Sequence, residues 1–144
     1  MSVTRDSSRG PNRCRALVVE DNPNVARMAT VLLELYGIDV KTLSHGRTVC
    51  ETARSFRPHF ILLDIGLPDM DGFQVADLLR QDAELSSTVI IAVSAYSPDM
   101  YPRRTAPFDH YLVKPVDFEV LVSLLKLSDV CSSNVPTEVD DRLR

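Results

Sequence analysis

Five polar side chains that could do chemistry each follow directly on a short apolar run. They are three acids, one alcohol and one amine: Glu20, Asp21, Asp64, Ser94 and Lys114. Carboxylates that crowd together in a partly dry site repel one another and take up protons unless a positive charge is held among them. If the fold brings the five together, we therefore expect a site that binds a cation.

The oxygen-rich set favours Mg²⁺ as that cation. Lys114 can offset one negative charge, and a hard divalent cation bound by carboxylates and water can offset the rest. His45, His59 and His110 are too scattered in the sequence to form a ligand motif for a softer metal, and we interpret them as surface or packing residues. A carboxylate beside Mg²⁺ and a lysine is also a suitable nucleophile for phosphoryl transfer, which would produce an aspartyl phosphate.

Alternating strands and helices must position these side chains. Short apolar runs predict strands at 16–19, 38–43, 60–63, 89–93 and 111–113, of which only the second alternates like an edge strand. Amphipathic stretches predict four helices. The first begins at 23, is capped by Asn22 and ends at Gly37, and the second runs from 49 to just before Pro58. The third covers 72–81 and the fourth runs from 117 to about 127. This order predicts a doubly wound α/β fold, whose parallel sheet has the carboxyl ends of all its strands at one edge.

Two of the predicted helices carry apolar faces of interest. The first is expected to bury one stripe, formed by Val25, Met28, Leu32 and Tyr36. The last has apolar residues over roughly 220° of its circumference, wider than packing on a sheet requires. Because an extra apolar face requires cover, we hypothesise a homodimer or partner contact through Val120, Leu124 and Leu127. The alternative is burial of these side chains under the C-terminal tail.

The composition predicts one domain with a tail at each end. The chain has 144 residues, of which 44% are apolar, and this size suffices for a hydrophobic core. Residues 1–13 and 128–144 lack apolar periodicity, so we expect a disordered N-terminal tail and a polar C-terminal tail. The domain itself is expected over 14–127, with no DNA-binding domain after it.

The composition and the lengths of the apolar runs also exclude several classes of protein. The longest apolar runs fall far short of the ~20 residues that span a bilayer, and the first residues contain no secretory signal. We therefore expect a cytoplasmic chain with no membrane contact. A net charge of −4 is opposite in sign to the basic surface that nucleic-acid-binding proteins use, so we expect no nucleic-acid binding. Cys14, Cys50 and Cys131 are odd in number and show no C-x-x-C spacing, so we expect reduced, structural thiols.

Four motifs together resemble the receiver domain of two-component response regulators. In chain order they are Glu20-Asp21, the loop DIGLPDMDG at 64–72, Ser94-Ala95, and YLVKP at 111–115. The resemblance covers residues 14 to about 127. It implies a flavodoxin-like five-stranded parallel sheet of order 2-1-3-4-5 with helices on both faces.

The resemblance also implies which phosphoryl donor reacts with the site and which residues bind the metal. Asp64 matches the residue that accepts a phosphoryl group from a sensor histidine kinase or a histidine phosphotransfer protein. Asp21, Asp64 and the backbone carbonyl of Gly66 match the ligands of Mg²⁺, and Glu20 matches a neighbour that acts on the metal through water. We therefore expect a phosphorylated, Mg²⁺-dependent signalling protein.

The remaining matched residues imply a switch. Ser94 matches the hydroxyl that hydrogen-bonds the phosphoryl group, Lys114 the cation that pairs with it, and Tyr111 the aromatic that moves inward as the hydroxyl shifts. Pro115 matches a residue preceded by a cis peptide. A phosphoryl group that contacts only one of two arrangements would bias the protein towards it.

Two other functions compete with the switch. A protein-interaction module could keep the same fold and signal without phosphate. A phosphatase of the haloacid-dehalogenase kind would require a second acid two residues after its nucleophile, and Gly66 occupies that position. We therefore expect a switch that does not turn over external substrates, acting on a downstream protein that the sequence does not name.

One segment departs from the family pattern. Residues 97–108 replace the usual fourth helix and contain Pro98, Pro102 and Pro107. Each proline inside a helix costs about 3 kcal/mol, so we expect a short, irregular or mobile segment. In many relatives this helix forms part of the output and dimer face, so its replacement puts that mode of output in doubt.

Overall fold

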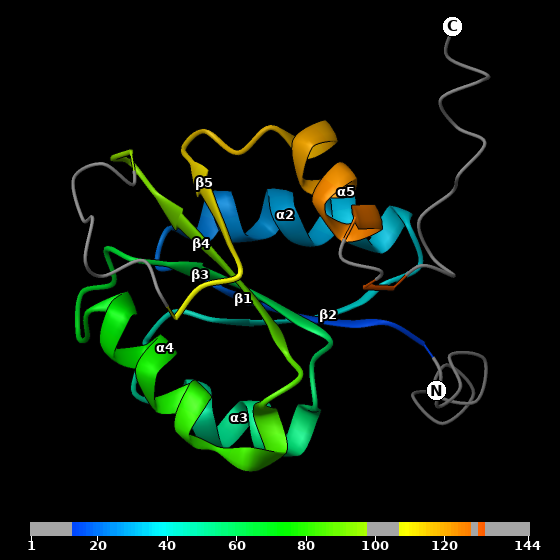
Figure 1. Ribbon diagram of the computed structural model, residues 1–144. Helices are drawn as coiled ribbons and strands as arrows, with labels where there is room; N and C mark the ends of the chain where they lie inside the picture. Colours follow the sequence, from blue (N-terminus) through cyan, green and yellow to red (C-terminus); the bar gives the residue numbers. More distant parts are fainter. Residues whose placement is uncertain (1–12, 98–106, 128–129, 132–144) are drawn as a thin grey trace, which may run out of the picture.

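Five parallel strands form a single sheet in the order β2-β1-β3-β4-β5, which confirms the predicted topology (Figure 1). The computed structural model describes residues 13–97, 107–127, 130 and 131 of the chain. The strands are β1 (Arg15–Val19), β2 (Asp39–Leu43), β3 (Phe60–Asp64), β4 (Val89–Ser94) and β5 (His110–Val113). All four neighbouring pairs run parallel, so the strands share a carboxyl edge.

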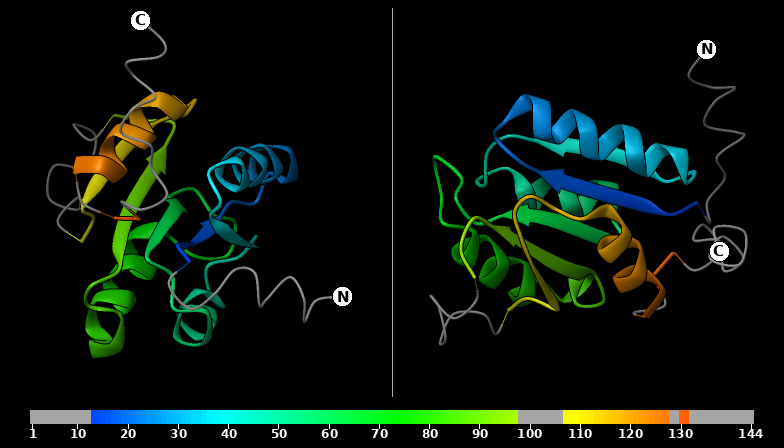
Figure 2. Two further views of the ribbon diagram at one scale, coloured as in Figure 1. Left: turned by 90° about the vertical axis from the view of Figure 1, so that its right-hand side faces the viewer. Right: turned by 90° about the horizontal axis from the view of Figure 1, so that it is seen from above.

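Helices cover both faces of this sheet. They are α2 (Pro23–Leu35), α3 (Val49–Phe56), α4 (Gly72–Gln81) and α5 (Phe118–Leu127), with a short 3-10 turn, η1 (Ala83–Leu85). Helices α2 and α5 lie on one face, and α3 and α4 lie on the other (Figure 2). No helix in the part of the chain described above has both the length and the apolar character needed to cross a bilayer.

The central strands are apolar except at their terminal residues, because both of their faces are covered. Along β1, Ala16 and Val18 belong to the core under α2 and α5, whereas Leu17 and Val19 belong to the core under α3 and α4. All five residues of β3 are buried. Uniform apolar runs are the expected signature of strands buried on two sides.

Helix α2 begins where the sequence predicts but buries a different face. The Asn22 side chain accepts hydrogen bonds from the backbone N–H groups of Asn24 and Val25, and Pro23 follows as the first helical residue. The predicted inward stripe is wrong in its first two members, since Val25 is 42% and Met28 65% exposed.

The fully buried residues of α2 are Ala26 and Leu33. The helix is therefore rotated so that a small side chain faces the sheet, which permits close approach of the helix. Leu32 and Tyr36, the other two members of the predicted stripe, are half-buried. The stripe as a whole lies to one side of the true contact face.

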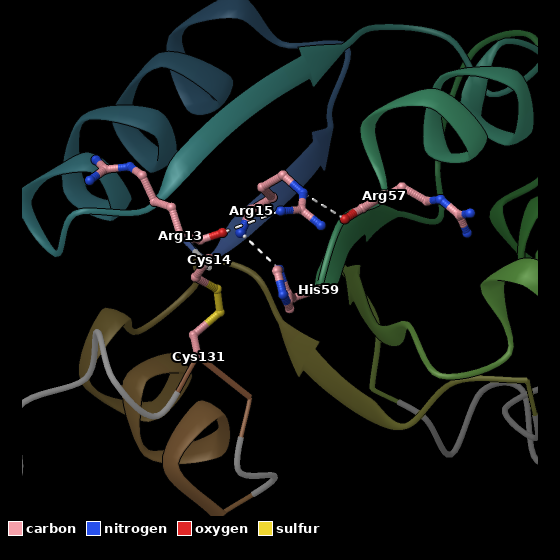
Figure 3. Close-up of a disulfide and its surroundings, with 6 residues drawn as sticks. All are labelled: Arg13, Cys14, Arg15, Arg57, His59 and Cys131. Atoms are coloured by element: carbon pink, nitrogen blue, oxygen red, sulfur yellow. Dashed lines mark hydrogen bonds between the residues drawn. A yellow bond between two sulfur atoms is a disulfide. The ribbon is translucent and has the colours of Figure 1, made fainter. Parts of the chain in front are cut away.

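The expectation of three reduced thiols is wrong for two of them. Cys14 and Cys131 form a disulfide, with their Cα atoms 5.3 Å apart, inside the range of about 4.4–6.8 Å that disulfides require. The two residues are 117 positions apart and meet because the chain returns after α5 to the edge where β1 begins (Figure 3). Sequence spacing carries no information about this encounter. Cys50 is a free thiol.

The chain beyond α5 packs onto the domain at the disulfide. Val130 is 9% exposed and belongs to the core under α2 and α5. Its backbone N–H donates to the carbonyl of Leu125 at 3.0 Å. This contact and the disulfide together fix residues 130 and 131.

The apolar arc of α5 is partly explained by the core. Leu121 and Leu125 are buried, Leu124 is half-buried against the same cluster, and Val120 is 44% exposed. The side chain of Leu127 lies outside the described residues. The homodimer or partner contact through Val120, Leu124 and Leu127 stays a prediction.

The segment that departs from the family pattern lies largely outside the described residues, and with it the predicted irregular conformation. Of 97–108, the structure describes Ser97, Pro107 and Phe108. The Phe108 ring packs edge-on against Phe73 of α4 and Tyr111 of β5, with ring centroids 5.3 and 6.4 Å apart. The end of the segment is therefore anchored next to β5 by the contact of these three aromatic rings.

Gly72 begins α4 directly against the strand end that carries Asp64. A Cβ atom at Gly72 would lie 2.6 Å from the Cα atom of Ile65 and 3.1 Å from the carbonyl oxygen of Asp64. The Gly72 N–H also donates to the carbonyl of Ile65 at 3.1 Å. The missing side chain thus lets the loop after β3 fold back onto the end of its own strand.

We expect Gly72→Ala to lower the free energy of unfolding by roughly 1–3 kcal/mol, because the added methyl group must displace backbone rather than a flexible side chain. Urea denaturation followed by circular dichroism measures the change. Gly66→Ala in the same loop is the matched control, since the nearest described atom to its Cβ would be Oδ1 of Asp64 at 3.8 Å. Equal stability of the two variants would contradict the close contact.

Candidate functional site

Three strands deliver one buried ion cluster to the carboxyl edge of the sheet. Glu20 follows β1, Asp64 ends β3 and Lys114 follows β5. The Lys114 Nζ atom lies 3.2 Å from Oε1 of Glu20 and 3.3 Å from Oδ2 of Asp64. The Lys114 N–H donates to the carbonyl of Ser94 at 2.7 Å, which fixes the lysine to β4. The peptide that follows, Lys114–Pro115, is cis, as the resemblance implies.

Carboxylate oxygens of Glu20, Asp21 and Asp64 lie within 4.8 Å of one another. Glu20 and Asp64 are each 6% exposed, whereas Asp21 is exposed. The sequence predicted that these three acids would meet, and the structure brings them together. Oxygen-only donors, one of them open to solvent, fit a hard cation such as Mg²⁺ that retains part of its water shell.

Burial and neighbouring charge shift the protonation of this cluster. Burial raises the pKa of Glu20, and the charge of Asp64 raises it further, although the N–H of Asn22, 3.1 Å from Oε2, lowers it. Burial by itself lowers the pKa of Lys114, but Asp64 and Glu20 outweigh it and raise the pKa overall. Lys114 therefore stays protonated at neutral pH and supplies a fixed positive charge beside Asp64.

A chain of hydrogen bonds links Ser94 to Tyr111. Ser94 ends β4 and is 4% exposed. Its Oγ atom accepts a hydrogen bond from the N–H of Tyr96 at 3.1 Å, and the carbonyl of Tyr96 accepts one from the Tyr111 hydroxyl at 3.0 Å. The two residues matched to the family's switch are thus joined through the backbone of a single residue, Tyr96.

The loop after β3 is held by Asp64 and by a second acid, Asp69, that sequence reasoning missed. The N–H of Gly66 donates to Oδ1 of Asp64 at 3.0 Å. Asp69 accepts hydrogen bonds from the N–H groups of Gly46 and Arg47 at 2.8 and 3.1 Å, and the bond from Gly46 is the main reason that the pKa of Asp69 is lowered. Asp69 thereby ties the loop to the connection between β2 and α3. Its only sequence signal is an acid after Pro68, which any turn could carry.

Comparison with known proteins identifies the fold and the family. The family model described as the response regulator receiver domain matches residues 16–126. The protein PilH of Pseudomonas aeruginosa is 33% identical over 114 residues, which cover 77% of this chain and 93% of PilH. The DNA-binding response regulator MtrA of Mycolicibacterium smegmatis is 30% identical over 127 residues, which cover 88% of this chain. The chain spans about half of MtrA, namely 55% of its length.

Solved structures agree with this assignment. The response regulator protein TrrA of Thermotoga maritima, crystallised in complex with Mg(2+)-BeF, has a TM-score of 0.72 at 28% identity, over 80% of this chain and 98% of TrrA. The chemotaxis response regulator CheY4 of Vibrio cholerae has a TM-score of 0.75 at 26% identity, over 81% of this chain and 99% of CheY4. The family model matches most of the chain, and the sheet order of the structure agrees with it. This chain therefore belongs to the response regulator receiver domain family.

Proposed function

We propose that this chain is a phosphorylation-activated switch. Asp64 accepts a phosphoryl group from a phosphohistidine of a sensor histidine kinase or a histidine phosphotransfer protein, with Mg²⁺ held by Asp21, Asp64 and the carbonyl of Gly66. Glu20 acts on the metal through water. The observation that carries the proposal is the buried carboxylate of Asp64, 3.3 Å from the ammonium of Lys114 at an edge with two further acids.

The transfer uses the nucleophilic oxygen of Asp64. A carboxylate oxygen attacks the phosphorus atom, the new P–O bond forms, and the P–N bond breaks with its electron pair passing to the donor imidazole. Lys114 stabilises the negative charge that develops on the transferred oxygens. Mg²⁺ would neutralise further charge there. Gly66 itself contributes no side chain that could block the approach of the donor imidazole.

The hydrogen-bond chain through Tyr96 supports a switch. When Ser94 turns its hydroxyl towards a phosphoryl group on Asp64, the N–H of Tyr96 loses or shifts its acceptor. Because Tyr111 is bonded to the carbonyl of the same residue, a shift at Tyr96 moves the environment of Tyr111 as well. The phosphoryl group biases this pair because it contacts only one arrangement.

The proposal includes what the switch acts on and where. We place it in the cytoplasm, as a regulator of another protein rather than an enzyme for external substrates, and we expect no direct nucleic-acid contact because the formal net charge is −4. Relatives such as MtrA are DNA-binding response regulators, and DNA binding by a longer protein would lie outside this domain. A homodimer through the exposed part of α5 remains part of the proposal.

Asp64→Asn should abolish Mg²⁺-dependent phosphorylation because it removes the nucleophilic oxygen while keeping the shape of the side chain. Intact-mass measurement after incubation with acetyl phosphate, or with a cognate kinase and ATP, reads out the modification. Asp77→Asn is the matched control, since Asp77 is an exposed acid on α4. Labelling that survives Asp64→Asn would place the acceptor elsewhere. A native chain that no donor labels would favour the phosphate-independent interaction module.

Asp21→Asn should weaken Mg²⁺ binding on the order of tenfold, because a metal ligand loses its charge. In the absence of metal the same change should raise the stability slightly, since it removes one of three mutually repelling carboxylates. Calorimetric titration with MgCl₂ measures the first effect and urea melts in EDTA the second. Asp77→Asn again serves as control. A lower metal-free stability would contradict the repulsion argument.

Tyr111→Phe should uncouple the switch without preventing phosphorylation, because it removes the hydroxyl bonded to Tyr96 and keeps the ring packed on Phe108. Hydrogen exchange of residues 94–96, with and without Mg²⁺ and beryllofluoride, measures the response, which we expect to be reduced. Tyr36→Phe, at the end of α2, is the control. An unchanged response in Tyr111→Phe would show that the hydroxyl plays no part.

A further inference from the structure

A pocket lies at the amino end of the sheet, opposite the acidic site, and it adjoins the disulfide. Its volume is about 420 Å³, and its lining includes Arg15, Arg57, His59, Glu84 and Cys131. We propose that this pocket binds an anionic low-molecular-weight thiol, which reduces the Cys14–Cys131 disulfide by exchange at Cys131. The proposal concerns this end of the sheet alone and does not depend on the proposed phosphorylation.

The lining attracts anions. Arg15 is fixed against the end of α3, where its Nε atom donates to the carbonyl of Phe56 at 2.9 Å. The same atom donates to the carbonyl of Arg57 at 2.8 Å (Figure 3). The Arg57 side chain is 54% exposed, with Nη1 3.9 Å from Oε1 of Glu84. Among the described residues of the lining Glu84 is the only acid, so two guanidinium groups outweigh one carboxylate. A net positive pocket raises the local concentration of anions.

His59 adds a polar wall but no charge. Its Nδ1 atom accepts a hydrogen bond from the N–H of Arg15 at 3.0 Å. Burial lowers the pKa of His59, and the charge of Arg15 lowers it further, so the imidazole is neutral at neutral pH. With Nδ1 acting as an acceptor, the ring hydrogen lies on Nε2. The pocket therefore offers a hydrogen-bond donor beside its guanidinium groups.

One of the two disulfide cysteines lines this pocket. Cys131 is partly buried and lines the pocket, whereas Cys14 is 2% exposed and does not. A small thiolate thus attacks the Sγ atom of Cys131. The S–S bond breaks, its electron pair stays on Sγ of Cys14, and a mixed disulfide forms on Cys131.

A second molecule of the thiol completes the reduction. Its thiolate attacks the outer sulfur of the mixed disulfide, and Cys131 leaves as a thiolate. Two small thiols are oxidised to one small disulfide, the protein disulfide gains two electrons, and the two thiol protons pass to Cys14 and Cys131. In a reducing compartment, the oxidised fraction of a protein disulfide depends on its reduction potential relative to that of the thiol pool.

A metal site is the competing use of the same residues. The Sγ atoms of Cys14 and Cys131 and a ring nitrogen of His59 lie within 4.8 Å of one another, which suits Zn²⁺ when the cysteines are reduced. Two observations oppose it: Nδ1 of His59 already accepts the N–H of Arg15, and the guanidinium groups of the lining repel a cation. The structure favours the anionic thiol.

The test compares thiols of different charge on the oxidised 144-residue chain carrying Cys50→Ser. Glutathione, which is anionic, and cysteamine, which is cationic, are supplied at equal thiolate concentration, and mass spectrometry after alkylation gives the reduction rates. The ratio of the two rates should exceed the ratio for an unstructured disulfide peptide by about tenfold, because the two thiols differ by two charges and each charge changes the rate about threefold at pocket distance in water. Equal ratios for chain and peptide would overturn the proposal.

Two variants separate the pocket from the general charge of the surface. Arg57→Gln should bring the ratio down to that of the peptide. Arg54→Gln should leave it unchanged, because Arg54 lies on α3 with the same 54% side-chain exposure but pairs with Asp82 outside the lining. An Arg57→Gln chain that behaves like the parent would overturn the proposal.

Two measurements on the reduced chain complete the test. Incubation with oxidised glutathione should restore the Cys14–Cys131 bond, and failure to form it would overturn the proposal. Titration with Zn²⁺ in the presence of excess Mg²⁺, which occupies the carboxylate site, should show no stoichiometric binding that depends on Cys131. Tight binding of one Zn²⁺ that Cys131→Ser abolishes would overturn the proposal and assign the residues to a metal.

Discussion

A single ammonium group shared by two buried carboxylates holds the carboxyl edge of the sheet together. Glu20 and Asp64 are each 6% exposed and both lie within 3.3 Å of Lys114. Two carboxylates so far from water would be costly without a paired cation. Since the three residues come from β1, β3 and β5, the contact makes three strands depend on one another. The same ion cluster therefore supplies the charge needed for chemistry and links the carboxyl ends of three strands.

Much of this arrangement could be predicted because the relevant signals are local. The central strands are buried on both faces, so their apolar runs stand out, and each run ends in the residue that matters, as Asp64 shows for β3. The Asn22 cap and the first proline of α2 locate a helix by chemistry that acts within three residues. Once the strands are known to be parallel, their carboxyl ends must share an edge.

Other features could not be predicted from local sequence signals, because they depend on the tertiary contacts between elements. The rotation of α2, which exposes Met28 and buries Ala26, is set by the surface beneath the helix rather than by its own periodicity. The partner of Cys14 is chosen by the path of the chain after α5. The link from Ser94 to Tyr111 uses backbone groups of Tyr96, and backbone groups are the same at every position.

The disulfide also changes how the domain would carry mechanical load. It joins residue 14, just before β1, to residue 131, after α5, so all the strands and helices of the described residues lie inside one covalent ring. A pulling force applied to the segments outside that ring passes through the sulfur–sulfur bond and bypasses the sheet. In the oxidised state the fold is therefore shielded from tension along the chain, and in the reduced state the same pull would shear β1 from its neighbours.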